Sequence, residues 1–171
     1  QVADTAYAMG MSSMNPDTRM VGPTDLSIAL GTFETTVVDM ANINATLAAD
    51  GVACKPMYFT AVTNNETGDN IAHIGTNCRQ ALSPSTAKQV QADLNATKAK
   101  GGTTEKLSVT TTDWRGKTGT TNDFGATWLA GSIPGYGTAS WLGDLRGPSY
   151  PAKNVWAFGN FYAEPYGSDV A

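Results

Sequence analysis

The chain has 171 residues, of which 41% are hydrophobic and 15% are charged, which suits one domain with a buried core. Its formal net charge of −4 argues against nucleic acid as a partner, and no apolar run is long enough to span a membrane. The single histidine, His73, and the two cysteines, Cys54 and Cys78, cannot build a zinc-type metal site.

The first thirty residues predict a short helix and a loop. Residues 1–11 are expected to be the tail of a helix, because apolar side chains recur on one helical face and Gly10 stands where the helix can end. Residues 12–24 are rich in Ser, Asn, Pro and Gly, which predicts a loop. Residues 26–30 predict a short strand or turn that leads into the next helix.

A second helix is expected after Thr35 or Thr36, since either threonine can serve as its N-cap. Asp39 then lies in the first turn, where the helix dipole favours a carboxylate. Gly51 is placed to end the helix. The apolar residues inside it recur at helical spacing and are expected to pack in the core: Met40, Ile43 and Leu47.

The middle of the chain predicts a β-hairpin. Residues 57–62 and 71–74 are the strand candidates, and the polar residues 64–70 predict the turn between them. Cys54 and Cys78 flank this hairpin, either as two buried thiols or as one disulfide that ties its ends together.

A third helix is expected to begin at Ser83, an N-cap that is followed by proline at the first helical position. It is expected to continue through three apolar positions and to stop by the glycines at 101–102. The threonine-rich residues 103–113 predict a loop over a sheet. The apolar positions of the helix are Ala87, Val90 and Leu94.

The last part of the chain predicts three strands, at residues 115–121, 126–132 and 137–143. Pro134 and Gly135 predict the turn between the second and third strands. The residues from 144 onward, rich in Gly, Pro and Tyr, predict no particular element.

The first of these strands carries Lys117, Thr118 and Gly119 in succession. Alternate side chains of a strand point to opposite faces, so Lys117 and Gly119 share one face while Thr118 and Thr120 share the other. Gly119 has no side chain, so a ligand backbone can approach closely there. An ammonium group, hydroxyls and free N–H groups at a sheet edge suit a carboxylate-bearing, amide-like ligand, although Lys-Thr-Gly alone often marks only a strand end.

Lys-Thr-Gly accompanies Ser-x-x-Lys and Ser-x-Asn motifs in serine β-lactamases and penicillin-binding proteins. The doubled threonine after Lys-Thr-Gly, the polar turn and the aromatic-containing strand that ends in glycine resemble the transpeptidase domain of the bifunctional (class A) penicillin-binding proteins. The resemblance covers most of residues 1–145 and thins after Gly147. The segments that carry it are residues 116–123 (GKTGTTND), 126–131 (ATWLAG), 29–34 (ALGTFE), 38–41 (VDMA) and 45–52 (ATLAADGV).

This resemblance implies a mixed α/β (α+β) fold of the penicillin-binding protein and serine β-lactamase type: an antiparallel sheet with helices packed on it, here as a partial domain. It also implies a place on the extracytoplasmic face of the bacterial cell membrane. That location and the acidic, sparsely charged composition favour a Cys54–Cys78 disulfide, which would add about 3 kcal/mol in the chain-entropy model. The implied chemistry requires no metal or cofactor.

The resemblance also implies roles for the residues of the motif. Lys117, Thr118 and Gly119 would line one wall of the active-site cleft, with Lys117 controlling the protonation of the neighbouring serine motif. The hydroxyls of Thr118 and Thr120, with Thr121 beside them, would bind the terminal carboxylate of a D-alanyl-D-alanine stem peptide or of a β-lactam. The backbone N–H of Thr120 would be one oxyanion donor.

Several neighbouring residues are expected to be structural instead. Trp128 and Trp141 are interpreted as core or cleft-floor packing, and residues 122–124 (Asn, Asp, Phe) as a structural turn.

Two further spacings imitate the missing motifs of the family. Ser85 and Lys88 stand at Ser-x-x-Lys spacing, and Ser13 with Asn15 forms a Ser-x-Asn triplet. Their order along the chain is the reverse of the family's, in which the nucleophile motif comes first. Ser85 also lies in a helix shortly before the Lys-Thr-Gly strand, far from the family's nucleophile. Both sets are therefore interpreted as structural.

The whole chain, residues 1–171, is thus expected to be the C-terminal part of a single transpeptidase domain. The nucleophilic serine and the Ser-x-Asn motif are expected upstream, in the N-terminal half of the domain, which would be this chain's partner. A membrane anchor is expected only in the full-length protein. Two alternatives are a non-catalytic module that senses β-lactams or peptidoglycan, and a serine β-lactamase.

Overall fold

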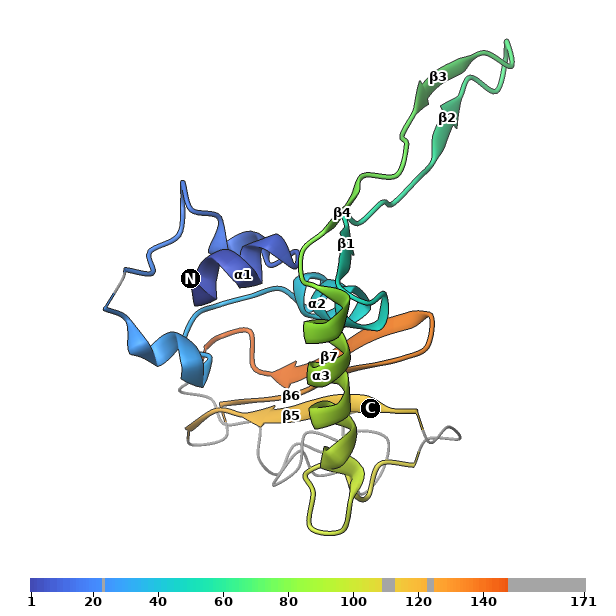
Figure 1. The fold of residues 1–171 in the computed structure, drawn as a ribbon. Coiled ribbons are helices and arrows are strands. Elements are labelled where there is room, and N and C mark those ends of the chain that lie inside the picture. Colours follow the sequence, from blue (N-terminus) through green and yellow to red (C-terminus); the bar gives the residue numbers. More distant parts are fainter. Residues whose placement is uncertain (23, 109–112, 123–124, 148–171) are drawn as a thin grey trace.

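A three-stranded antiparallel sheet organises the molecule in the computed structural model, which describes residues 1–22, 24–108, 113–122 and 125–147 (Figure 1). The strands lie in the order β5 (Arg115–Thr120), β6 (Ala126–Ile133) and β7 (Tyr136–Gly143). The turn between β6 and β7 is formed by Pro134 and Gly135, as predicted, and Gly135 has a φ of 85° that suits the third position of a type II turn.

Helix α2 (Val37–Ala48) packs on one face of the sheet, against β6 and β7. The approach is close because β7 has a glycine there: a methyl group on Gly137 would collide with the carbonyl oxygen of Ala41 and the backbone nitrogen of Ala45. Leu47 is buried as expected, whereas Met40 and Ile43 of the predicted core stripe are only half-buried.

The first turn of α2 ties the N-terminal segment to the core. Thr36 is the N-cap, and its hydroxyl accepts a hydrogen bond from the N–H of Asp39 at 3.0 Å. The buried carboxylate of Asp39 accepts from the N–H and hydroxyl of Ser12, at 2.9 and 2.6 Å. About two turns further along the helix, the hydroxyl of Thr46 donates to the carbonyl of Met9. The prediction that this helix starts at a threonine cap is confirmed.

The N-terminal segment contains α1 (Val2–Ala8) and two 3₁₀ helices, η1 (Ser12–Met14) and η2 (Leu26–Leu30). Of the two alternatives predicted for residues 26–30, the strand is wrong, whereas the turn agrees with the structure, because a 3₁₀ helix is a run of turns with local backbone hydrogen bonds. The N–H of Ile28 bonds to the carbonyl of Asp25, and that of Gly31 to the carbonyl of Ile28. Gly31, with a φ of 72°, ends the helix.

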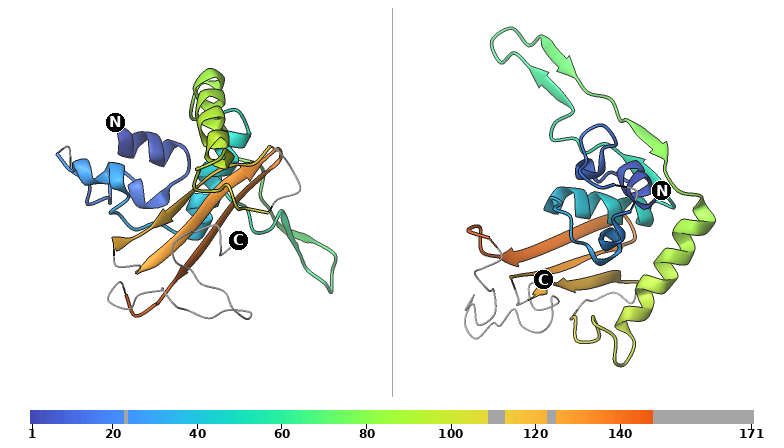
Figure 2. Two further views of the ribbon diagram at one scale, coloured as in Figure 1. Left: turned by 90° about the horizontal axis from the view of Figure 1, so that it is seen from below. Right: turned by 90° about the vertical axis from the view of Figure 1, so that its left-hand side faces the viewer.

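The predicted hairpin forms an arm that projects from the body (Figures 1 and 2). Strand β2 (Ala61–Thr63) pairs with β3 (Asn70–His73), so residues 57–60 lie outside the strand that was predicted to include them. Two short strands that the sequence did not predict, β1 (Val52–Cys54) and β4 (Cys78–Gln80), form the base.

The base of this arm is closed by a disulfide between Cys54 and Cys78, as expected. The two cysteines stand directly opposite each other in the β1–β4 register, so the bond joins the two ends of the hairpin. This disulfide therefore holds the two strands together where the arm leaves the body.

Helix α3 (Pro84–Asn95) runs beside β5 and carries on as the 3₁₀ helix η3 (Ala96–Lys98). Ser83 is its N-cap and accepts from the N–H of Thr86 at 3.1 Å, as predicted. The loop after it packs Thr104 inside, with 0% of its surface exposed. Residues 109–112 of the predicted loop, and residues 123–124 of the predicted turn, lie outside the described residues.

Candidate active site

The strand that carries Lys-Thr-Gly is an edge strand of the sheet, since among the described residues β5 pairs with β6 alone. Just past its end, the N–H of Thr121 donates to the carbonyl of Ala126 at 3.0 Å. Facing pairs alternate in an antiparallel ladder, so the backbone groups of residues 115, 117 and 119 point toward β6. Those of residues 116, 118 and 120 point to the outer edge.

Side chains at the end of α3 occupy the first half of this outer edge. Asn95 Nδ2 donates to the carbonyl of Trp114 at 2.8 Å, and Thr97 Oγ1 donates to the carbonyl of Gly116 at 2.8 Å. Both acceptors are even-numbered residues, which agrees with the alternation. Beyond Gly116 the helix no longer covers the edge, and the N–H groups of Thr118 and Thr120 are directed outward.

The two faces of β5 carry the side chains that the sequence assigns to them. Gly137 pairs with Ser132, which pairs with Arg115, so these three residues share the face that α2 covers. Lys117 and Gly119 follow at intervals of two and lie on this face as well. Thr118 and Thr120 lie on the opposite face.

The ammonium group of Lys117 lies at the outer edge. Its Nζ donates to the carbonyl of Thr118 at 2.9 Å, and the side chain is exposed. A positive charge, a threonine hydroxyl and outward N–H groups therefore occur within four consecutive residues. This combination can hold an anionic group and stabilise a developing oxyanion.

Trp128 and Trp141 lie beside Gly119 on the face that α2 covers. They pair across β6 and β7, with ring centroids 6.5 Å apart and an interplanar angle of 60°, an edge-to-face contact. A methyl group on Gly119 would stand 3.5 Å from Cβ of Trp128, an ordinary contact distance. The sheet itself therefore has room for a side chain at residue 119.

Thr121 serves the turn that follows the motif. Its hydroxyl accepts a hydrogen bond from the N–H of Ala126 at 2.7 Å. The predicted substrate role of Thr121 stays a prediction, and the structure gives its hydroxyl a structural partner.

Three of the four residues that imitate the missing motifs have structural partners. The Oγ atom of Ser85 is 2.9 Å from that of the N-cap Ser83, and Lys88 lies 3.8 Å from the carboxylate of Asp50. No hydrogen bond joins Ser85 to Lys88, both of which are described. Asn15 accepts from the N–H of Asp17 in a local turn, 3.0 Å away.

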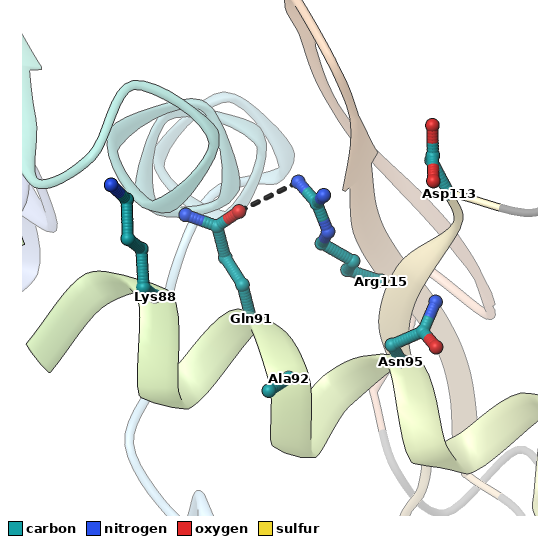
Figure 3. A pocket seen from close by; sticks show the side chains of 6 residues that line it. All are labelled: Lys88, Gln91, Ala92, Asn95, Asp113 and Arg115. Atoms are coloured by element: carbon teal, nitrogen blue, oxygen red, sulfur yellow. Dashed lines mark hydrogen bonds between the residues drawn. The ribbon is translucent and has the colours of Figure 1, made fainter. Parts of the chain in front are cut away.

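A pocket of about 510 Å³ opens between α3 and the start of β5 (Figure 3). On one wall Arg115 donates to Oε1 of Gln91 at 2.6 Å, and Nε2 of Gln91 donates to the carbonyl of Leu47 in α2. Through these two hydrogen bonds Gln91, which belongs to α3 and is only 7% exposed, connects β5 with α2. The pocket is lined by Lys88, Gln91, Ala92, Asn95, Asp113 and Arg115.

Sequence reasoning missed the residues of α3 and η3 that hold β5. The available signal was a polar residue on the buried side of a helix: Gln91 follows the fully buried Ala87 by four positions. Asn95 comes four positions later and donates to the carbonyl of Trp114, the residue directly before β5. Their common spacing marks the helix face that contacts β5.

Two features are absent from the described part of the chain. No three His, Cys, Asp or Glu side chains gather there to hold a metal ion. None of the described helices is both long enough and apolar enough to cross a membrane.

Comparison with known proteins gives consistent relatives. The family "Penicillin binding protein transpeptidase domain" matches residues 8–141. Penicillin-binding protein 1A of Aquifex aeolicus is 32% identical over 117 residues, which cover 68% of this chain and 16% of that protein. Penicillin-binding protein 1A of Mycobacterium tuberculosis is 30% identical over an alignment of 188 positions, which covers 93% of this chain and 21% of that protein. The chain thus spans about a fifth or less of these relatives' length.

Among solved structures, the penicillin-binding protein PonA1 from Mycobacterium tuberculosis superposes with a TM-score of 0.75 at 28% identity, covering 99% of this chain and 47% of that chain. The complex of PonA1 with penicillin V gives a TM-score of 0.76 at 27% identity, with 99% and 46% covered. The predicted mixed fold, an antiparallel sheet with packed helices that forms part of a larger domain, is confirmed. With a family match over more than half of its length, the chain belongs to the transpeptidase domain family of the penicillin-binding proteins.

Proposed function

We propose that residues 1–171 are the C-terminal part of a single peptidoglycan D,D-transpeptidase domain and supply the Lys-Thr-Gly wall of its active site. The observation that carries this proposal is that, among the described residues, side chains of α3 and η3 bond to the outer edge of β5 at its start but not further along the strand. Its first half is covered by Asn95 and Thr97, and its second half turns the N–H groups of Thr118 and Thr120 outward. An open edge beside a lysine and two threonines suits a substrate that carries both an amide and a carboxylate.

Each residue of the motif then has a distinct task. Lys117 sets the charge around a serine that lies outside this chain, and the hydroxyls of Thr118 and Thr120 bind the terminal carboxylate of the stem peptide. The N–H of Thr120 donates to the oxyanion, where loss of one donor costs about 3 kcal/mol of transition-state stabilisation. Gly119 leaves space for the ligand backbone, because the sheet does not require a glycine there.

The proposed reaction is acyl transfer. The serine attacks the carbonyl of the penultimate D-alanine, the terminal D-alanine leaves with a proton, and an acyl-enzyme forms. An amine of a neighbouring stem peptide then attacks the ester and releases the serine. The solved complex of PonA1 with penicillin V supports β-lactams as ligands of the same cleft, because they imitate D-alanyl-D-alanine.

The proposal places this chemistry on the extracytoplasmic side of the bacterial membrane, where peptidoglycan is cross-linked. The N-terminal half of the domain is the proposed partner that brings the serine motifs to β5. The relatives named penicillin-binding protein 1A support this assignment over that of a β-lactamase.

The first test replaces the lysine of the motif in the complete transpeptidase domain. Lys117→Ala is expected to abolish acylation by a fluorescent penicillin, because it removes the ammonium group at the open edge, while circular dichroism and the melting temperature stay close to wild type. Lys88→Ala is the matched control, since Lys88 is an exposed lysine whose ion-pair partner is Asp50. Unchanged acylation of the Lys117→Ala domain would contradict the assignment of Lys117 to the active site.

A further inference from the structure

The hydroxyl of Thr97, beside the covered half of β5, lies within hydrogen-bond distance of three other groups. Oγ1 of Thr97 lies 2.8 Å from Oγ1 of Thr104, 2.8 Å from the carbonyl of Gly116 and 2.9 Å from the carbonyl of Leu94. Thr97 has one hydroxyl proton, so it can donate to only one of these three groups at a time.

The burial of Thr104 decides the direction of these hydrogen bonds. Its side chain is 0% exposed, and among the described residues its hydroxyl bonds to that of Thr97. A buried hydroxyl proton needs an acceptor, so Thr104 donates to Thr97. The proton of Thr97 is then available for a carbonyl.

Of the two carbonyls, that of Gly116 has the greater need of a donor. The carbonyl of Leu94 shares the backbone N–H of Ala96 with the carbonyl of Ala92, whereas that of Gly116 faces the outer edge of β5, where Thr97 is the donor. The hydrogen bonds therefore form a relay in which Thr104 donates to Thr97 and Thr97 donates to the carbonyl of Gly116, and each bond polarises the next.

The backbone of the loop holds the two threonines in register. The N–H of Thr104 donates to the carbonyl of Thr97 at 3.1 Å, and that of Gly102 to the carbonyl of Ala99 at 2.8 Å. A methyl group on Gly102 would collide with the carbonyl oxygen of Thr97, so the loop closes this tightly only with glycine at that position. The relay is thus built on a fixed piece of backbone.

The relay ends where the open edge begins. Gly116 is the last residue of β5 whose carbonyl is held from α3 or η3, and Thr118 and Thr120 follow at about 7 and 13 Å along the strand. Gly116 and Thr120 belong to the same strand, so a sideways shift of the strand at Gly116 would also move the N–H of Thr120. Displacement of a reacting group by about 1 Å can cost about 100-fold in rate.

We propose that Thr97 and Thr104 are positioning residues for the acyl-transfer site, which they serve by fixing the outer edge of β5 at Gly116. This inference rests on the proposed function. It assigns no contact with substrate to either threonine and predicts that both act on the rate of acylation through the strand.

The test is the kinetics of acylation of the complete domain by penicillin V, resolved into the limiting rate constant and the dissociation constant of the first complex. Thr97→Val is expected to lower the limiting rate constant about 10- to 100-fold, with full final stoichiometry and a smaller change in the dissociation constant. Thr97→Ser keeps the hydroxyl and is expected to stay within about twofold of wild type. Thr5→Val is the matched control, because its hydroxyl donates to the carbonyl of Gln1 in α1, away from β5.

A second variant tests the order of the relay and remains informative if one variant folds poorly. Thr104→Val is expected to slow acylation less than Thr97→Val, and the double variant is expected to be no slower than Thr97→Val alone, since Thr104 acts through Thr97. Rate constants are used because they do not depend on the yield of folded protein.

The outcomes separate the two proposals. A wild-type domain that penicillin V never acylates would overturn the proposed function and this inference with it. Normal acylation of wild type together with an unchanged rate constant in Thr97→Val and Thr104→Val would overturn the positioning role alone. A Thr97→Ser domain as slow as Thr97→Val would do the same, because the hydroxyl would then be irrelevant.

Discussion

At the scale of single residues, glycines in the strands let other groups come close to the sheet. Gly137 admits the backbone of α2, and Gly116 and Gly131 lie beneath the ring of Trp114. A methyl group on Gly116 would also stand 2.6 Å from the carbonyl oxygen of Ala130. These glycines act by their small volume, which sets the distances between layers.

Gly137→Ala should therefore destabilise the complete domain by about 1–3 kcal/mol, because the added methyl group pushes α2 away from β7. The free energy of unfolding from urea denaturation measures this effect. Gly75→Ala is the matched control, since a methyl group on Gly75 meets nothing within 4 Å. Equal stability of the two variants would show that α2 does not pack on β7 in this way.

At the scale of elements, α3 connects the sheet to the rest of the chain. Its start depends on Ser83, whose hydroxyl accepts from the N–H of Thr86, and its end holds the edge of β5 through Asn95 and Thr97. The helix thus transmits its own position to the strand that carries Lys-Thr-Gly.

Ser83→Ala is expected to lower the stability of the complete domain by about 1 kcal/mol through loss of the N-cap. Ser85→Ala, two residues away, is expected to leave both the stability and the labelling by fluorescent penicillin unchanged. Thermal unfolding and gel labelling measure the two effects. Loss of labelling in Ser85→Ala would instead identify Ser85 as the nucleophile.

The elements that sequence predicted well are those whose chemistry is local. Thr36 and Ser83 cap their helices with their own hydroxyls, and Pro134 with Gly135 makes the turn between two strands. Strands β1 and β4 were missed because three residues each are too few to show alternation. The strand alternative at residues 26–30 rested on apolar residues, and among the described residues no strand pairs with them.

The candidate site was predictable only in part for the same reason. The faces of Lys117 and Thr118 follow from the two-residue period of any strand. The hold of Asn95 and Thr97 on β5 joins residues about twenty positions apart, and its geometry depends on how α3 packs. Local sequence patterns carry no such distance information.

At the scale of the whole molecule, the chain spans about half the length of PonA1 in its solved structure. Large apolar side chains of η2 are exposed, with Leu26 at 83% and Leu30 at 85%. Among the described residues, no strand pairs with the outer edge of β5 at the residues proposed to bind substrate. We therefore expect the chain to work together with the N-terminal half of its domain, which would complete the cleft.

The central claim is that the nucleophile and the Lys-Thr-Gly wall lie on different parts of the domain. The most direct test produces this 171-residue chain and the preceding half as two separate polypeptides, purifies them together and labels them with fluorescent penicillin before a denaturing gel. We expect label on the preceding half, and none when this chain carries Lys117→Ala. Label on the 171-residue chain itself would contradict this division of the site and would place the nucleophile at Ser85 or Ser13.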